Sequence, residues 1–85
     1  MAVRSIANDG PWTRHAYAIP KRVGKAVVRN KVRRRLREIL RALPVSEGFD
    51  IVISVRQQAA EASFLELKTE LSLLLKRARL LAAPE

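Results

Sequence analysis

The residues with the clearest chemical potential are the cationic side chains that crowd one quarter of the chain. Ten of the seventeen Lys and Arg residues lie between Lys21 and Arg41, where Glu38 is the only acid. Most charge runs are simply solvated, but a solvated helix normally interleaves Glu with Lys to form ion pairs. Arginine also grips phosphate through paired donors. This segment therefore predicts binding to a polyanion, with nucleic acid as the leading class.

Several positions of this segment are candidate contacts to nucleic acid. Asn30 combines a donor and an acceptor, which suits a base edge, a sugar or a hydrated ion. The predicted binding set is Lys21, Arg22, Lys25, Arg29, Asn30, Lys31, Arg33, Arg34, Arg37 and Arg41. RNA is slightly favoured over DNA, because helix-turn-helix spacing, zinc ligands and a heptad-linked basic region are absent. Tyr17, on a predicted strand next to the basic segment, could stack on an unpaired base.

Catalysis by protein side chains is not expected. His15 is the only histidine and the chain has no cysteine, so paired-histidine sites, thiolate metal sites and disulfides are excluded. Gly24 stands alone, which does not make a phosphate-binding loop and fits a turn before a helix. Isolated carboxylates such as Glu38 and Asp50 are more often solvated or ion-paired than catalytic. We therefore expect no catalytic residue, no metal ligand and no cofactor bound by the protein.

Composition bounds the class of protein. A chain of 85 residues suffices for one domain, predicted over residues 1–85, and 48% hydrophobic residues indicate a folded core. The formal net charge of +9 calls for an anionic partner. No apolar run reaches the length of a signal peptide or the ~20 residues of a membrane span, so a soluble cytoplasmic protein is expected. Binding to an acidic membrane is a poor alternative, because the apolar stripes are needed for the core.

Two strands are predicted before the basic segment and one after it. Residues 2–7 form a candidate strand, the turn-rich sequence at 8–11 follows, and residues 12–19 form a second strand that Pro20 ends. Together these segments suggest a β-hairpin. The third strand is the β-branched run at 49–55, which reads as buried.

A helix must position the cationic side chains. From about 25 to 43 the apolar residues recur at helical spacing, and Pro44 ends the pattern. The apolar stripe comprises Val28, Val32, Leu36, Ile39, Leu40 and Leu43, and the adjacent face carries Asn30, Arg33, Arg34, Arg37 and Arg41. A second helix begins at the capping box of Ser63 and Glu66 and runs to about residue 81. The order β-β-helix-β-helix predicts an α+β sandwich, a small mixed sheet with two helices.

Residues 21–38, KRVGKAVVRNKVRRRLRE, closely resemble the signature of the bacterial ribonuclease P protein component. That family has Lys-Lys-x-Gly-x-Ala-Val-x-Arg-Asn-Arg, followed by basic residues and an Arg-Glu pair. The resemblance extends to the strand that leads into the motif at 14–20, to the last strand at 49–56 and to the final helix at 63–80. It covers nearly the whole chain.

The resemblance implies a fold like the second domain of ribosomal protein S5, with an unusual left-handed β-α-β crossover formed by the basic helix. It implies that this helix contacts a catalytic RNA. It also implies that a cleft beside the sheet, with Tyr17 and Ile19 as lining residues, holds the single-stranded 5′ leader of precursor tRNA. The reaction is then endonucleolytic removal of that leader. By the same analogy the RNA subunit and its magnesium ions perform the hydrolysis, and no obligate protein partner is expected.

Two departures from the family pattern bear on these expectations. Lys31 stands where the signature has arginine, so the charge survives without the bidentate fork. The family's N-terminal basic helix has no counterpart before the first predicted strand, which bears on leader binding more than on binding of the catalytic RNA. The alternative function is a ribosome-associated structural protein that uses the same basic face without processing RNA.

Overall fold

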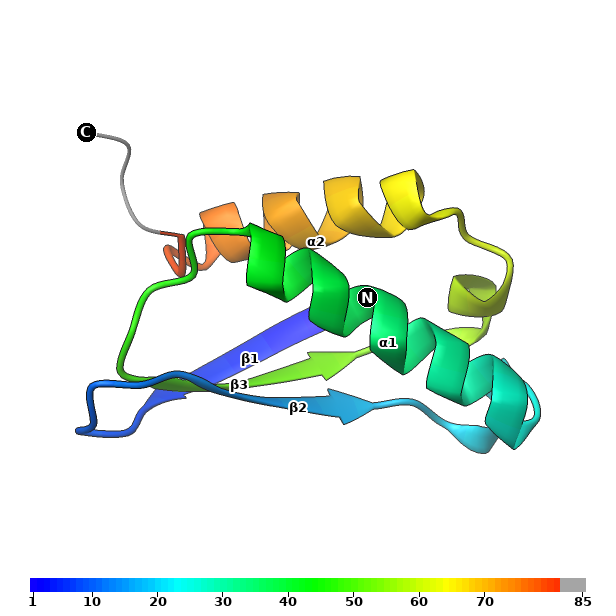
Figure 1. Cartoon of the computed structure of the whole chain (residues 1–85), viewed down its shortest axis with the longest axis horizontal. Helices are drawn as coiled ribbons and strands as arrows, with labels where there is room; N and C mark the ends of the chain where they lie inside the picture. Colours follow the sequence, from blue (N-terminus) through cyan, green and yellow to red (C-terminus); the bar gives the residue numbers. More distant parts are fainter. Residues whose placement is uncertain (82–85) are drawn as a thin grey trace.

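The computed structural model describes residues 1–81, which form a three-stranded sheet and two helices (Figure 1). The strands are β1 (Ala2–Ala7), β2 (Arg14–Ala18) and β3 (Phe49–Ser54), in the spatial order β1-β3-β2. β3 pairs antiparallel with β1 and parallel with β2. The mixed sheet of the predicted α+β fold is therefore confirmed.

The predicted hairpin between β1 and β2 is wrong, because β3 lies between them. β3 has the strongest reason to be central, since Ile51 and Ile53 are almost completely buried while β1 and β2 have mostly exposed side chains. The connection from β1 to β2 must therefore span β3, about two strand spacings or ~10 Å. The predicted turn sequence and residues 12–13 make this wider loop, in which Asp9 rather than Gly10 takes a positive φ, at 60°.

Both helices cover the same face of the sheet (Figure 1). α1 runs over Ala26–Ala42 and α2 over Phe64–Arg77, and each is preceded by a short 3₁₀ helix, η1 (Lys21–Val23) or η2 (Gln57–Ala60). α1 connects β2 to its parallel neighbour β3, so these three elements form the expected β-α-β crossover. Within residues 1–81, no helix has the length and apolar character needed to cross a membrane.

Local hydrogen bonds set the limits of α2. The predicted capping box is present, because the Ser63 Oγ accepts from the Glu66 N–H (3.1 Å) and the Glu66 Oε1 accepts from the Ser63 N–H (3.0 Å). The helix ends about one turn earlier than predicted. Arg79 takes a φ of 58°, and the Leu80 N–H turns back to donate to the Leu75 carbonyl at 2.9 Å. This turn returns the buried Leu80 side chain to the core.

The core fills the space between the helices and the sheet. Its members that are at most 3% exposed include Val32, Leu36, Ile39 and Leu40 of α1, Ile51 and Ile53 of β3, and Leu67, Leu71 and Leu75 of α2. The predicted apolar stripe of α1 is confirmed, with Val28 and Leu43 partly buried at its margins. Truncating one buried leucine to alanine costs about 2–5 kcal/mol, so this burial fixes the rotation of α1 about its axis.

A clasp centred on Asp50 ties the loop between β1 and β2 to the sheet. Arg14 donates from Nε and Nη2 to the two carboxylate oxygens of Asp50, at 2.9 and 2.6 Å. Asn8 donates from Nδ2 to the same carboxylate at 3.0 Å and accepts from the Gly10 N–H at 2.9 Å. The hydrogen bond from Arg14, followed by that from Asn8, lowers the pKa of Asp50. The clasp therefore depends on an ionised carboxylate.

Replacing Asp50 with Asn tests the clasp through its pH dependence. Because the pKa of Asp50 is lowered in the folded protein, its contribution to stability is complete above the unfolded value of about 3.9 and is lost as the pH falls through the folded value. We expect Asp50→Asn to unfold at a lower temperature than the parent near pH 7. The difference should close under acid conditions, as measured by thermal unfolding over a pH series.

Asp9→Asn is the control, because it removes a carboxylate from the same loop and asparagine also tolerates a positive φ. It should change the melting temperature little at any pH. A deficit in Asp50→Asn that stays constant into acid would contradict the role given to the Asp50 carboxylate.

Candidate nucleic-acid interface

A tight turn places the cationic residues at the start of α1. Gly24 has a φ of 154°, and a Cβ built at this position would lie 2.9 Å from the Val28 side chain. Glycine is therefore required here, as expected for a turn before the helix. The turn leaves Lys21, Arg22 and Lys25 exposed around the N-terminus of α1.

The N-terminus of α1 can receive an anion. Lys25 is the N-cap residue, its side chain makes no capping hydrogen bond, and the first turn contains no acidic side chain. The first N–H groups of a helix lack partners within the helix, and the helix dipole adds partial positive charge at this end. Together with the three exposed cationic side chains, these N–H groups make an arrangement that suits a phosphate.

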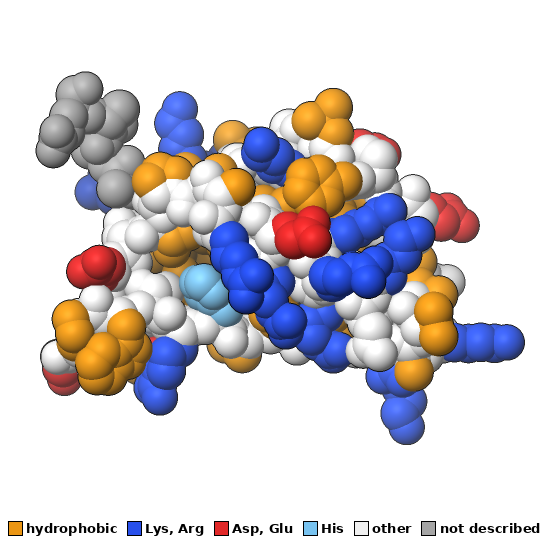
Figure 2. Space-filling model, viewed as in Figure 1, with side chains coloured by type: hydrophobic (Ala, Val, Ile, Leu, Met, Phe, Trp, Pro, Cys, Tyr) orange, Lys and Arg blue, Asp and Glu red, His pale blue; other side chains and the backbone are white. Residues whose placement is uncertain are grey.

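The other members of the predicted set lie along α1. Asn30, Lys31, Arg34, Arg37 and Arg41 are exposed, and Arg29 and Arg33 are half-buried beside the apolar stripe. Figure 2 shows the band of Lys and Arg side chains on the face where α1 lies. Arg33, Arg37 and Arg41 follow one another at four-residue spacing, about 6 Å apart along the helix axis. This length of helix can face several phosphates of one strand.

The predicted set is not a single stripe. Arg29 and Lys31 are two residues apart, so their side chains leave α1 in nearly opposite directions. Arg29 lies on the same side as Arg33 and Arg37, while Lys31 lies on the side of Glu38. We define the arginine face as Arg33, Arg34, Arg37 and Arg41. Lys31 lies outside this face.

Asn30 positions one arginine of this face. Its Oδ1 accepts a hydrogen bond from Arg33 Nη1 at 2.8 Å. One acceptor position of the amide is therefore used within the protein. The two N–H donors remain, so Asn30 suits ligands that accept hydrogen bonds. These ligands are phosphate and carbonyl oxygens. The structure thus narrows the donor-and-acceptor role predicted from the sequence.

Arg35 has a structural contact that the sequence did not reveal. Its Nη1 donates to the Ala62 carbonyl at 3.0 Å, which ties α1 to the segment before α2. The side chain is half-buried, unlike the exposed side chains of the nearby Arg34 and Arg37. Arg35 lies within the signature but not in the predicted binding set, and this contact gives it a structural role instead.

Tyr17 and Ile19 were predicted to line a cleft beside the sheet. Neither residue lies on the face of the sheet that is free of helices. Tyr17 pairs in register with the buried Ile53, so its side chain points toward the helices. Burial raises the pKa of Tyr17, and the nearby Arg37 and Arg41 partly oppose this effect. Ile19 follows β2 and is half-buried against the core. Tyr17 therefore adjoins the arginine face.

Within residues 1–81, no helix lies over the opposite face of the sheet (Figure 1). The strand register and the alternation of side chains place Ala2, Ser54 and Ala18 in one row of this face. The next rows are Arg4, Val52 and Ala16, then Ile6, Asp50 and Arg14. The resulting surface combines small and aliphatic side chains with Arg4 and with the ion pair of Arg14 and Asp50. The sequence alone did not reveal it, because it depends on the strand order.

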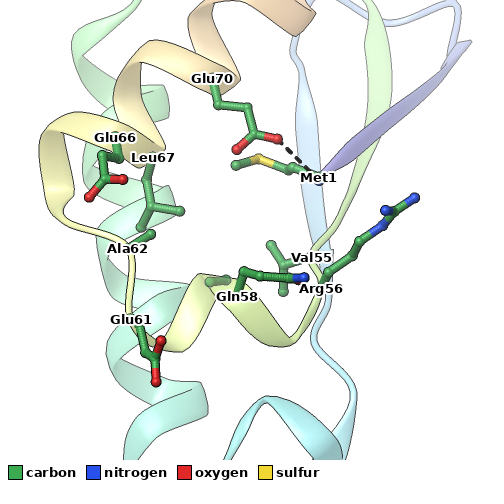
Figure 3. A pocket seen from close by; sticks show the side chains of 10 residues that line it. Met1, Val55, Arg56, Gln58, Glu61, Ala62, Glu66, Leu67 and Glu70 are labelled. Atoms are coloured by element: carbon green, nitrogen blue, oxygen red, sulfur yellow. Dashed lines mark ion pairs between the residues drawn. The ribbon is translucent and has the colours of Figure 1, made fainter.

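A hollow of about 510 Å³ lies away from the arginine face, beside η2 and the start of α2 (Figure 3). Its lining includes Glu61, Glu66 and Glu70, and the Met1 amino group lies 3.2 Å from Glu70 Oε1. The three glutamates outnumber the two cationic groups of the lining, Arg56 and the Met1 amino group, so the hollow is a poor place for a phosphate. In residues 1–81, no three His, Cys, Asp or Glu side chains are grouped to hold a metal ion.

The fold and the arginine face define a small α+β protein with a surface suited to a polyanion. Comparison with known families matches residues 1–79 to the family described as Ribonuclease P. The chain belongs to the ribonuclease P protein family. This match supports the resemblance based on the signature and does not favour the ribosome-associated alternative.

Curated relatives and solved structures agree with this assignment. The chain is 45% identical to the ribonuclease P protein components of Symbiobacterium thermophilum and Thermus brockianus, over 85% and 84% of its length. It spans only 64% and 43% of those proteins, but 71% of a Thermoanaerobacter relative that is 39% identical. The RNase P proteins of Staphylococcus aureus and Thermotoga maritima superpose with TM-scores of 0.82 and 0.80, at 28% and 33% identity. Those matches cover 94% and 88% of this chain and 75% and 74% of the solved ones.

Replacing Gly24 with Ala tests the turn that positions the interface. The added Cβ would meet Val28 at 2.9 Å in a backbone conformation that disfavours side chains. We expect a loss of about 1–3 kcal/mol in the free energy of unfolding, measured by chemical denaturation. Gly10→Ala is the control, since its φ is not positive and its nearest contact is the exposed Trp12 side chain at 3.2 Å. Equal losses in both variants would contradict a special role for Gly24.

Proposed function

We propose that this chain is the protein subunit of a ribonuclease P ribonucleoprotein and that its arginine face and the N-terminus of α1 bind the catalytic RNA. The observation that carries the proposal is the signature turn. It joins an uncapped helix N-terminus to a row of exposed arginines on one rigid helix. Family membership and the structural similarity to RNase P proteins support it.

The chemistry of the proposed complex divides between protein and RNA. We assign hydrolysis of the precursor tRNA to the RNA subunit and the magnesium ions that it holds. The protein then reduces the repulsion between RNA phosphates and binds no cofactor itself. A cytoplasmic location, where tRNA processing would occur in a bacterium, is part of the same proposal.

The 5′ leader of precursor tRNA is assigned to the uncovered face of the sheet. A single strand needs a surface on which its bases can lie, and the small side chains of Ala16, Ala18 and Ser54 leave such a surface open. Arg4 supplies positive charge on the same face, where the charge of Arg14 is already paired with Asp50. The leader would then be remote from Tyr17, which lies on the other side of the sheet.

Reconstitution with a ribonuclease P catalytic RNA tests the proposed function. We expect the protein to raise the rate of 5′ leader removal from precursor tRNA at low magnesium concentration, where repulsion between RNA strands is least screened by metal ions. The measurement is the rate of cleavage with and without protein over a magnesium series. The same rate in both reactions at low magnesium would count against the proposal.

The double variant Arg34→Ala and Arg37→Ala tests the arginine face. Each lost phosphate contact should reduce the salt dependence of RNA binding by about one counterion, so affinity should fall and its slope against salt should flatten. Stability should change by less than about 1 kcal/mol, because both side chains are exposed. The double variant Lys68→Ala and Arg77→Ala removes equal charge from exposed positions of α2 and should retain most of the affinity. Equal weakening by the two pairs would show that net charge, and not the arginine face, governs binding.

A further inference from the structure

His15 and Tyr17 lie side by side on β2, at the edge of the sheet. They are two residues apart, so they point to the same face at a separation of about 7 Å. They pair in register with Ile51 and Ile53, whose burial shows that this face is the one beneath the helices. In the part of the chain that the structure describes, β2 is an edge strand, and the His15 side chain is exposed.

Two arginines of the arginine face reach the same place. Arg37 and Arg41 lie close enough to Tyr17 to act on its pKa. His15 is one side-chain repeat from Tyr17 along β2, about 7 Å, so a strand of RNA held by these arginines beside Tyr17 needs to extend only that distance to reach the imidazole. We define the α1–β2 flank as His15, Tyr17, Arg37 and Arg41. It joins two cationic side chains to two aromatic rings.

Unsatisfied polar atoms are concentrated beside this flank. In residues 1–81, the buried side-chain atoms without a hydrogen-bond partner are the Tyr17 hydroxyl and the Arg29 Nε. Arg29 lies one and two helical turns before Arg33 and Arg37, on the same side of α1. Folded proteins leave few such atoms without a partner, and each one calls for an explanation. Arg37 is a side-chain donor beside the Tyr17 hydroxyl, which links the aromatic and the cationic parts of the flank.

The imidazole of His15 suits a base better than a phosphate. Partial burial lowers the pKa of His15, which favours the neutral form of the ring. A neutral aromatic ring attracts a base by stacking but adds no charge for a phosphate. The sequence pattern predicted no role for His15, because the arginines that lie near its neighbour Tyr17 are more than twenty residues away in the chain.

We propose that His15 stacks on one unpaired base of the bound RNA while Arg37 and Arg41 hold the phosphates beside that base. The inference rests on the proposed function and adds that the arginine face selects a strand with an unpaired nucleotide. A base within a duplex is stacked between its neighbours and does not offer a free face to a side chain. Duplex RNA would therefore use the arginines and leave His15 without a contact.

Binding of two short RNAs by His15 variants tests the inference. The probes are a fluorescently labelled single strand and a blunt duplex with the same number of phosphates, measured by fluorescence anisotropy at fixed salt. We expect His15→Ala to weaken binding of the single strand about tenfold and of the duplex less than about twofold. The slope of affinity against salt should not change, because no phosphate contact is lost. His15→Phe retains a stacking ring and should bind the single strand within about twofold of the parent.

Two control variants separate the possible failures. Trp12→Ala removes another exposed aromatic side chain, from the β1–β2 loop, and should leave both affinities unchanged. Arg37→Ala should weaken binding of both probes if the proposed function holds.

Unchanged binding in His15→Ala together with weakened binding in Arg37→Ala would overturn the role of His15 alone. No binding of either probe by the parent protein would instead overturn the proposed function, and equal losses on both probes in His15→Ala would overturn the preference for an unpaired base.

Discussion

The structure depends on the division of α1 into a buried side and a charged side. Val32, Leu36 and Ile39 pack into the core with almost no exposure, which leaves little freedom to rotate the helix. The arginine face is then fixed in direction by apolar packing and not by ion pairs of its own. This separation matters because clustered positive charges repel one another, and the core must offset that repulsion. The charged side can therefore serve a partner without holding the fold together.

The position of α1 in the chain adds a second constraint. As the connection between two parallel strands, it lies across the sheet and brings its arginines over β2. The glycine turn before it fixes where the helix begins, and Asn30 and Arg35 make local hydrogen bonds that hold nearby parts of the segment. The cationic side chains of this segment consequently differ in what they contact. Some are free to contact a ligand, Arg33 is held by a neighbour, and Arg35 belongs to the protein's own packing.

Sequence patterns predicted the elements better than their arrangement. The apolar spacing that gave α1, and the capping box that begins α2, depend on residues within a few positions of one another, and both are present in the structure. The strand order was predicted wrongly because pairing of β1 with β3 joins residues far apart in the chain. The same limit applied to the site. The signature identified the cationic residues, but the contact of Arg35 with Ala62 and the approach of Arg37 to Tyr17 required the packed fold.

The central claim is that the exposed side of α1 faces a folded RNA, and tethered cleavage measures this directly. The chain contains no cysteine, so a single Arg34→Cys substitution gives one attachment point for an iron chelate that cuts nearby RNA through hydroxyl radicals. Lys68→Cys provides the matched point on α2. We expect defined cuts in a ribonuclease P catalytic RNA from position 34 and few from position 68. Strong cuts from position 68 with none from position 34 would contradict this account.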